Sequence, residues 1–160
     1  MIQIGKRYSL EVVKQVNFGV YLNAQELGQV LLPNKFVPTG CNVGDMVDVF
    51  LYLDSEDIVI ATTQKALAQV GEFAYLKVVA TGPYGAFLDW GLEKDLMVPY
   101  AEQNTPMEVG KSYLVAMYLD SVDVRPTASS KIDKFLEEEN NNTLKEIDYQ
   151  IEAITKKFKE

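Results

Sequence analysis

The chain contains no histidine, and this absence excludes much familiar enzyme chemistry. Without imidazole there is no histidine general base, no Ser–His or Cys–His nucleophile pair and no histidine metal ligand. Carboxylate or lysine chemistry stays open, but no glycine-rich phosphate loop accompanies it. A single cysteine, Cys41, cannot form an internal disulfide, which is typical of a reducing cytoplasm. We therefore expect a cytoplasmic, non-catalytic protein that needs no cofactor and no metal.

Long apolar runs and an excess of positive charge are also missing. No stretch approaches ~18 apolar residues, so no membrane span is expected. The N-terminus lacks a basic region followed by a long apolar run, so no signal peptide is expected. Lysine and arginine number 15 against 23 acidic residues, which gives a net charge of -8. Any nucleic-acid-binding surface must therefore be a local face, because overall charge opposes phosphate contact.

An internal repeat organises the chain. Of the 160 residues, 48% are apolar, which favours a packed core over disorder. A shift of 66 residues (71 − 5, from Gly5 to Gly71) matches the sequence to itself. The matches pair 18–23 with 84–89, Pro33 with Pro99, 43–44 with 109–110, and 52–55 with 118–121. Beyond these, 61–62 matches 128–129, so the second copy carries one extra residue near Arg125, which we interpret as a bulge.

Each copy has the pattern of five short strands. In the first copy these are 8–16, 18–23, the short buried strand 31–32, 46–53, and a last strand after the turn at 54–57. In the second they are 74–81, 84–89, the short buried strand 97–98, 112–119, and a last strand after 120–123. Short strands with regular turns predict small closed barrels of the oligonucleotide-binding (OB) class. The predicted fold is mainly β, with barrels at 1–65 and 66–131 and a C-terminal helical segment at 132–160.

The C-terminal segment differs in kind from the repeats. Residues 132–137 predict a short helix, and three asparagines at 140–142 interrupt it. Thr143 and Glu146 then form a capping box at the start of a second helix. Apolar residues spaced 3, 4, 3, 4 make one seam on this helix: Leu144, Ile147, Ile151, Ile154 and Phe158. The seam could pack on the second barrel or join two copies as a homodimer, because two heptads are too few to decide.

The order aromatic, glycine, small residue, aromatic occurs twice, at 18–21 and 84–87. On a flat strand the two rings would point to opposite faces. A glycine can bend the strand so that both rings reach one surface, where bases stack for ~1–3 kcal/mol each. The alternative is that one ring of each pair belongs to the core. The candidate stacking residues are Phe18, Tyr21, Tyr84 and Phe87.

Other polar and aromatic candidates carry a weaker signal. Lys35 and Lys94 could contact phosphates, although solvated surface lysines are common. Trp90 could be a stacking surface or a contact between the barrels. Four aspartates could bind a cation but are explained as well by turn formation. These aspartates are Asp54, Asp57, Asp120 and Asp123.

Here the residues resemble a known family. The string Gly-x-x-x-x-Leu-x-Val, followed by aromatic-Gly-small-aromatic-Leu, resembles the S1 RNA-binding domain. More narrowly, 31–35, 54–57 with 61–63, and 85–92 with 94–96 resemble the conserved virulence factor B family. That bacterial family has tandem S1 domains and is linked to RNA binding and control of gene expression. The resemblance implies the same for this chain over roughly residues 3–137.

The chain departs from the family pattern at several positions. Pro33 and Pro99 stand where single S1 domains usually carry a histidine. Ile58 stands where an arginine is expected after the turn aspartate, and the second copy has Arg125 one step out of register. The third S1 domain and the winged helix of the family have no counterpart before Glu160, so we expect the chain to lack both or to be a fragment.

The sequence therefore favours a cytoplasmic, non-catalytic protein that binds single-stranded RNA and regulates bacterial gene expression after transcription. The expected RNA-contacting residues are Phe18, Tyr21, Lys35, Tyr84, Phe87, Lys94 and Arg125, with the second copy favoured over the first. The alternative is a protein–protein interaction module that uses the barrels and a dimerising C-terminal helix, because OB barrels host many functions.

Overall fold

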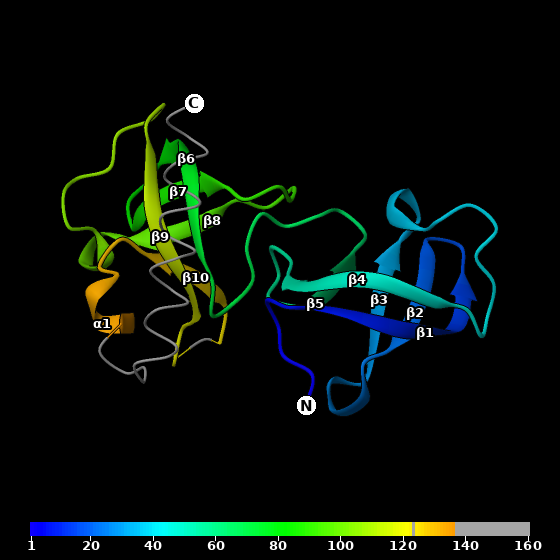
Figure 1. The fold of residues 1–160 in the computed structure, drawn as a ribbon. Coiled ribbons are helices and arrows are strands. Elements are labelled where there is room, and N and C mark those ends of the chain that lie inside the picture. The colour runs from blue at the N-terminus through cyan, green and yellow to red at the C-terminus, as the bar shows by residue number, and fades with distance from the viewer. Residues whose placement is uncertain (123, 137–160) are drawn as a thin grey trace. The chain divides into compact units, whose positions relative to one another are not determined.

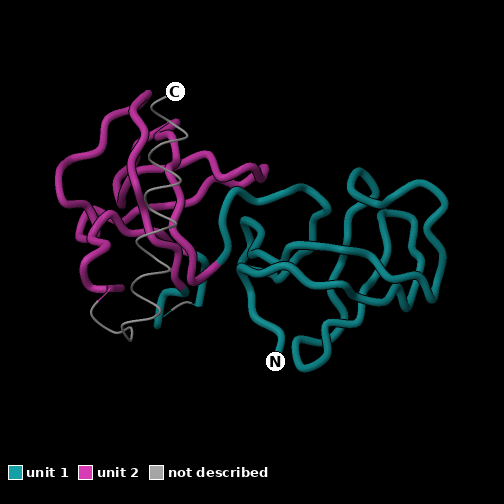
Figure 2. Tube along the Cα trace, viewed as in Figure 1, with its two compact units in different colours: residues 1–69, 119–126 teal, residues 70–118, 127–160 magenta. Residues whose placement is uncertain are grey.

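The computed structural model describes residues 1–122 and 124–136. The chain divides into two compact units, of residues 1–69 with 119–126 and of residues 70–118 with 127–160 (Figure 2). Each unit contains one of the two five-stranded repeats, which confirms the mainly β, two-barrel fold predicted from the sequence. The predicted domain boundaries at 65 and 131 stay a prediction.

The first barrel is closed, with the strand order β1-β2-β3-β5-β4 (Figure 1). Its strands are β1 (Arg7–Val16), β2 (Gly19–Asn23), β3 (Gln29–Pro33), β4 (Met46–Leu53) and β5 (Val59–Thr62). Neighbouring strands are antiparallel except β3 and β5, which pair in parallel at Leu31 and Ile60. That parallel pair closes the barrel and covers the edge strands of the small sheet.

Strict alternation of side chains fills the interior of the first barrel. On β2, Val20 and Leu22 are buried, and Tyr21 between them is only half-buried. Each fully buried Leu or Val contributes about 1.5–3 kcal/mol. The fully buried members of this core are Val12, Leu22, Ala24, Leu32, Val49, Leu51 and Ala61. Because β2 and β3 alternate in phase, their outward side chains form a row on the barrel surface.

The second barrel repeats this plan but is nearly closed rather than closed. Its strands are β6 (Phe73–Thr81), β7 (Gly85–Asp89), β8 (Leu96–Pro99), β9 (Ser112–Leu119) and β10 (Pro126–Ser129). They form a five-stranded sheet in the order β10-β9-β6-β7-β8, which leaves β8 and β10 at its two edges. Its core is at most 2% exposed at Leu76, Val78, Ala86, Leu88, Leu96, Val98, Val115, Met117 and Ala128.

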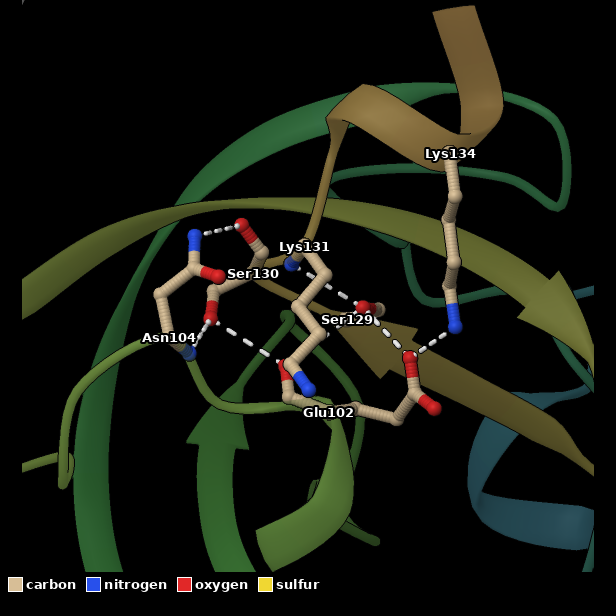
Figure 3. Close-up of polar contacts among 6 residues, drawn as sticks. All are labelled: Glu102, Asn104, Ser129, Ser130, Lys131 and Lys134. Carbon is tan, nitrogen blue, oxygen red and sulfur yellow. Dashed lines mark hydrogen bonds and ion pairs between the residues drawn. The ribbon is translucent and has the colours of Figure 1, made fainter. Parts of the chain in front are cut away.

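A side-chain cluster joins the two edges of the second barrel where backbone pairing stops (Figure 3). Glu102, which follows β8 in the short helix η3 (Tyr100–Glu102), accepts hydrogen bonds from the Ser129 hydroxyl at 2.8 Å and the Ser130 backbone N–H at 3.0 Å. The Lys134 ammonium also donates to its carboxylate. Burial raises the pKa of Glu102, but the hydrogen bonds from Lys134 and Ser129 outweigh it and leave the pKa lowered.

The extra residue of the second copy lies in the turn before the last strand, not in a bulge of the strand itself. In the first barrel the Asp54 N–H donates to the carbonyl of Ile58, four residues on. In the second barrel the Asp120 N–H donates to the carbonyl of Arg125, five residues on. The longer turn explains why the sequence match slips by one residue at this point.

The predicted short helix at 132–137 is present as α1 (Asp133–Leu136). Ile132, Phe135 and Leu136 pack against Phe73 and Ala116 on the outer side of β6 and β9. The predicted second helix and its seam, from Leu144 to Phe158, lie outside the described residues. Within the described part of the chain, no helix is long and apolar enough to cross a membrane.

Candidate nucleic-acid interface

The glycine of each aromatic motif allows two strands to approach closely. A Cβ placed on Gly19 would lie 2.2 Å from the carbonyl oxygen of Leu32, and one on Gly85 would lie 2.2 Å from that of Val98. Both glycines pair directly with a proline, Gly19 with Pro33. The repeated glycine therefore permits tight packing of β2 on β3 and of β7 on β8.

Both rings of the first aromatic motif lie on the outside of the first barrel. Phe18 belongs to the turn between β1 and β2 and is 56% exposed. Tyr21 points outward from β2 and is half-buried. Their ring centroids are 6.4 Å apart at an interplanar angle of 85°, which is a favourable edge-to-face arrangement. The expectation that the two rings share one surface therefore agrees with this geometry.

A bulge in β1 places a cation beside these rings. The pairing of β1 with β2 shifts between Val12, which is buried opposite Leu22, and Lys14, which is opposite Tyr21. The bulge moves Lys14 to the outer face, where its side chain is exposed. Leu31 flanks Tyr21 on the other side and is half-buried, so it faces outward instead of joining the core as expected. We call Lys14, Phe18, Tyr21 and Leu31 the first aromatic face.

Lys35 lies next to the first aromatic face. The preceding residue, Asn34, donates its backbone N–H to the Phe18 carbonyl at 3.1 Å and its side-chain amide to the Asn17 carbonyl at 2.6 Å. Lys35 is exposed, with its Nζ 5.2 Å from the centroid of the Phe36 ring. The two hydrogen bonds of Asn34 thus keep Lys35, the next residue, close to the turn that contains Phe18.

The second barrel presents a corresponding face with three aromatic residues. Tyr84 is 79% exposed, Tyr100 is 52% exposed and Phe87 is half-buried. The Tyr100 N–H donates to the Tyr84 carbonyl at 3.3 Å, and the Tyr100 hydroxyl donates to the Gly82 carbonyl at 2.5 Å. Tyr100 stands where the first barrel has Asn34, and nothing in the motif 84–87 indicated it. Only an extension of the 66-residue repeat alignment to position 100 could have identified Tyr100 from the sequence.

The neighbours of Phe87 differ from those of Tyr21. The register places Ala80 opposite Phe87 on one side, where the first barrel has Lys14, and Met97 on the other, where it has Leu31. Like Leu31, Met97 is half-buried and faces outward. We call the set Ala80, Tyr84, Phe87, Met97 and Tyr100 the second aromatic face.

The remaining sequence-predicted residues lie apart from the aromatic faces or in the loops beside them. Lys94 is half-buried in the loop between β7 and β8, where its carbonyl accepts a hydrogen bond from the Trp90 indole. Trp90 is 2% exposed, so it is not a stacking surface. Arg125 forms an ion pair with the Asp57 carboxylate, and both belong to the unit that contains the first barrel.

Two of the four turn aspartates, Asp54 and Asp120, perform the structural role that was the simpler alternative, and Asp123 lies outside the described residues. Asp54 Oδ1 accepts the backbone N–H groups of Glu56 at 2.8 Å and Ile58 at 3.0 Å, and Asp120 Oδ1 accepts that of Val122 at 2.8 Å. No cluster of three or more potential metal-ligating side chains occurs in the part of the chain that the structure describes.

Two five-stranded barrels of the OB type, each with an outward aromatic side chain on its second strand, define the architecture of this chain. The comparisons agree: residues 4–64, which span the first barrel, match the family model of the S1 domain. The first barrel is therefore similar in sequence to the S1 domain.

Two relatives are similar to this chain over longer stretches. An uncharacterized protein of Bacillus subtilis (strain 168), YitL, is 30% identical over 95 residues, which are 59% of this chain and 32% of that protein. A crystal structure of a multidomain protein with nucleic acid binding domains from Streptococcus pneumoniae TIGR4 superimposes with a TM-score of 0.66 at 18% identity, and the match covers 86% of this chain and 51% of that one. The chain thus spans about a third and about half of these relatives.

Proposed function

We propose that this chain is a single-stranded RNA-binding protein of the conserved virulence factor B type, acting without catalysis in the post-transcriptional control of bacterial gene expression. The observation that carries the proposal is the pair of outward aromatic faces, one on each barrel, at the strands through which OB folds bind oligonucleotides. The S1 match over residues 4–64 and the fold shared with a multidomain protein that has nucleic acid binding domains support it.

The first aromatic face combines the two elements that single-strand binding needs. Phe18 and Tyr21 offer rings on which bases stack whatever their identity. Lys14, one strand away from Tyr21, supplies a charge for the adjoining phosphate. Lys35 extends this charge at the end of β3. Salt screens the repulsion between RNA and the distant acidic residues that give the net charge of -8. The attraction of the nearby lysines therefore dominates only when RNA is close to this face.

The second aromatic face contributes stacking with little phosphate contact. Tyr84 and Tyr100 expose large ring surfaces, but Ala80 replaces the lysine of the first barrel. Arg125, expected to aid this copy, is held by Asp57.

The experiment that tests the proposal is a titration of fluorescein-labelled 12-nucleotide single-stranded RNA, followed by anisotropy at low salt. Changing Tyr21 to Ala is expected to raise the Kd about 5- to 100-fold, since stacking is worth ~1–3 kcal/mol per base. The control is Val43→Ala, which changes a side chain 58% exposed in a loop away from the faces. Absence of binding by the unaltered protein at high micromolar concentration, or an unchanged Kd for the Tyr21 variant, contradicts the proposal.

A further inference from the structure

Beside each aromatic face, the second and third strands carry one further pair of outward residues, and this pair differs chemically between the two barrels. In the first barrel this row holds Asn23 opposite Gln29, which are both neutral amides. In the second barrel the equivalent positions are Asp89 and Asp95, which are both carboxylates. The printed register pairs Leu88 with Leu96, so one further step places Asp95 opposite Asp89. Each barrel therefore has a different set of hydrogen-bonding groups beside its central ring.

The row lies within reach of a base stacked on the second aromatic face. Asp89 is two residues beyond Phe87 on the same outer side of β7, which is about 7 Å along the strand. Asp95 stands in the same relation to Met97, because the inward Leu96 between them is 1% exposed. A base that stacks on Phe87 therefore presents its edge to these two carboxylates.

The two carboxylates differ in what already occupies them. Asp89 Oδ1 accepts the backbone N–H of Gly91 at 3.0 Å, and Lys77 lies opposite Asp89 on β6. Asp95 is exposed, and within the described residues no hydrogen bond reaches its carboxylate. Partial desolvation of its carboxyl group and the charge of the neighbouring Asp89 raise the pKa of Asp95. Asp95 is thus the acceptor left for a ligand, while Lys77 offsets the charge of Asp89.

The chemistry of an ionised carboxylate selects among bases. It accepts hydrogen bonds and donates none. Guanine presents N1–H and N2–H₂ side by side, which is a pair of parallel donors for the two carboxylate oxygens. Uracil presents one donor flanked by two carbonyl acceptors, which the carboxylate repels. Adenine and cytosine present one amino group each. The amides of Asn23 and Gln29 donate as well as accept, so the first barrel has no comparable preference.

We propose that the second aromatic face selects guanine over uracil, with the base stacked on Phe87 and its Watson–Crick edge bound by the Asp95 carboxylate. This inference rests on the proposed RNA-binding function and assigns to the second barrel the choice of base. The first barrel, with Lys14 and Lys35, then supplies affinity without base preference.

The test compares two labelled RNAs of 12 nucleotides, one of uridine alone and one in which every third nucleotide is guanosine, spaced to avoid guanine quadruplexes. The unaltered protein is expected to bind the guanosine-containing RNA about tenfold more tightly, since a bidentate pair is worth ~1–3 kcal/mol. Inosine, which lacks the N2 amino group, is expected to remove most of this gain. The variant Asp95→Asn is expected to lose the preference and to bind oligouridine at least as tightly as the unaltered protein, because the repelling carboxylate is gone.

The control variant is Glu108→Gln, which neutralises an exposed carboxylate of the second barrel away from this face. It is expected to keep the tenfold preference. Equal affinity of the unaltered protein for both RNAs, or a preference that survives in Asp95→Asn, overturns the inference and leaves the proposed function intact. Absence of binding to either RNA overturns the proposed function and the inference with it.

Discussion

Lys14 lies directly opposite Tyr21 across the antiparallel pairing of β1 and β2. A bulge after Val12 makes this possible, because it moves Lys14 from the inward to the outward side of the strand. The repeat contains the same shift between Val78 and Ala80, but there the outward residue is alanine. The bulge that both barrels share in their first strand thus determines which residue lies beside the stacking ring, and that residue is a lysine only in the first barrel.

Changing Lys14 to Gln is expected to weaken RNA binding and to reduce its salt dependence. One lost phosphate contact on a single strand lowers the slope of log K against log salt by about 0.7. Titrations between 50 and 200 mM salt measure this slope, with Lys65→Gln as an exposed control outside the faces. A slope equal to that of the unaltered protein would show that Lys14 touches no phosphate.

Changing Gly19 to Ala is expected to destabilise the first barrel by about 1–3 kcal/mol or more, because the new Cβ meets the Leu32 carbonyl at 2.2 Å. Gly44→Ala is the matched control, since its φ is +98° but nothing lies within 4 Å of the new Cβ. It should lose only the roughly 1–2 kcal/mol of an unfavourable backbone conformation. Urea unfolding measures both variants, and equal losses would refute the close-approach explanation.

Glu102→Gln is expected to lower the stability of the second barrel by about 1 kcal/mol at pH 7, since partial exposure weakens the charged hydrogen bonds from Lys134 and Ser129. The pKa of Glu102 is lowered from its ordinary value of 4.5, so the stabilisation is present above that value and is lost as the pH falls through the lowered pKa. Urea unfolding should show that the difference in free energy of unfolding between the variant and the unaltered protein is smaller at pH 3 than at pH 7.

The control for this pair is Glu108→Gln. The Glu108–Lys111 ion pair is exposed by 63% and 65%, so its removal should change stability little at either pH. A difference for Glu102→Gln that is as small as that of Glu108→Gln at pH 7 would contradict the role given to Glu102 in joining β8 and β10.

Removal of residues 143–160 tests whether the predicted apolar seam joins two copies. If the seam dimerises, the full chain sediments as a dimer and the shortened chain as a monomer. The binding of RNA by the shortened chain provides the control that the barrels remain folded. If the full and the shortened chain sediment with the same number of chains per particle, dimerisation through this helix is excluded. Packing of the helix on the second barrel is then the remaining alternative.

Much of the fold followed from the sequence because the repeat was visible in it. Strand positions, the proline ends of β3 and β8, and the outward placing of Phe18 and Tyr84 follow from alternation and turn residues. Lys14 was not predictable in the same way. Strict alternation from the buried Leu10 and Val12 places residue 14 inside, and only the bulge reverses this.

The contacts of the other candidate residues could not be predicted from the sequence either. Arg125 lies one residue out of register, and its pairing with Asp57 depends on tertiary structure rather than on any local pattern. Trp90 is buried, and its indole N–H is satisfied by the Lys94 carbonyl within a loop whose conformation the sequence does not predict. The acceptor row at Asp89 and Asp95 required the strand register, which a sequence does not fix.

The most direct test of the central claim is a titration of the ¹⁵N-labelled chain with single-stranded RNA, followed residue by residue in amide NMR spectra. Shifts should concentrate on the outer rows of β2 and β3 around Tyr21 and Leu31, and of β7 and β8 around Phe87 and Met97. Amides on the exposed side of β4, such as Met46 and Asp48, should remain unchanged. Shifts that centre on β4, or none at saturating RNA, would contradict it.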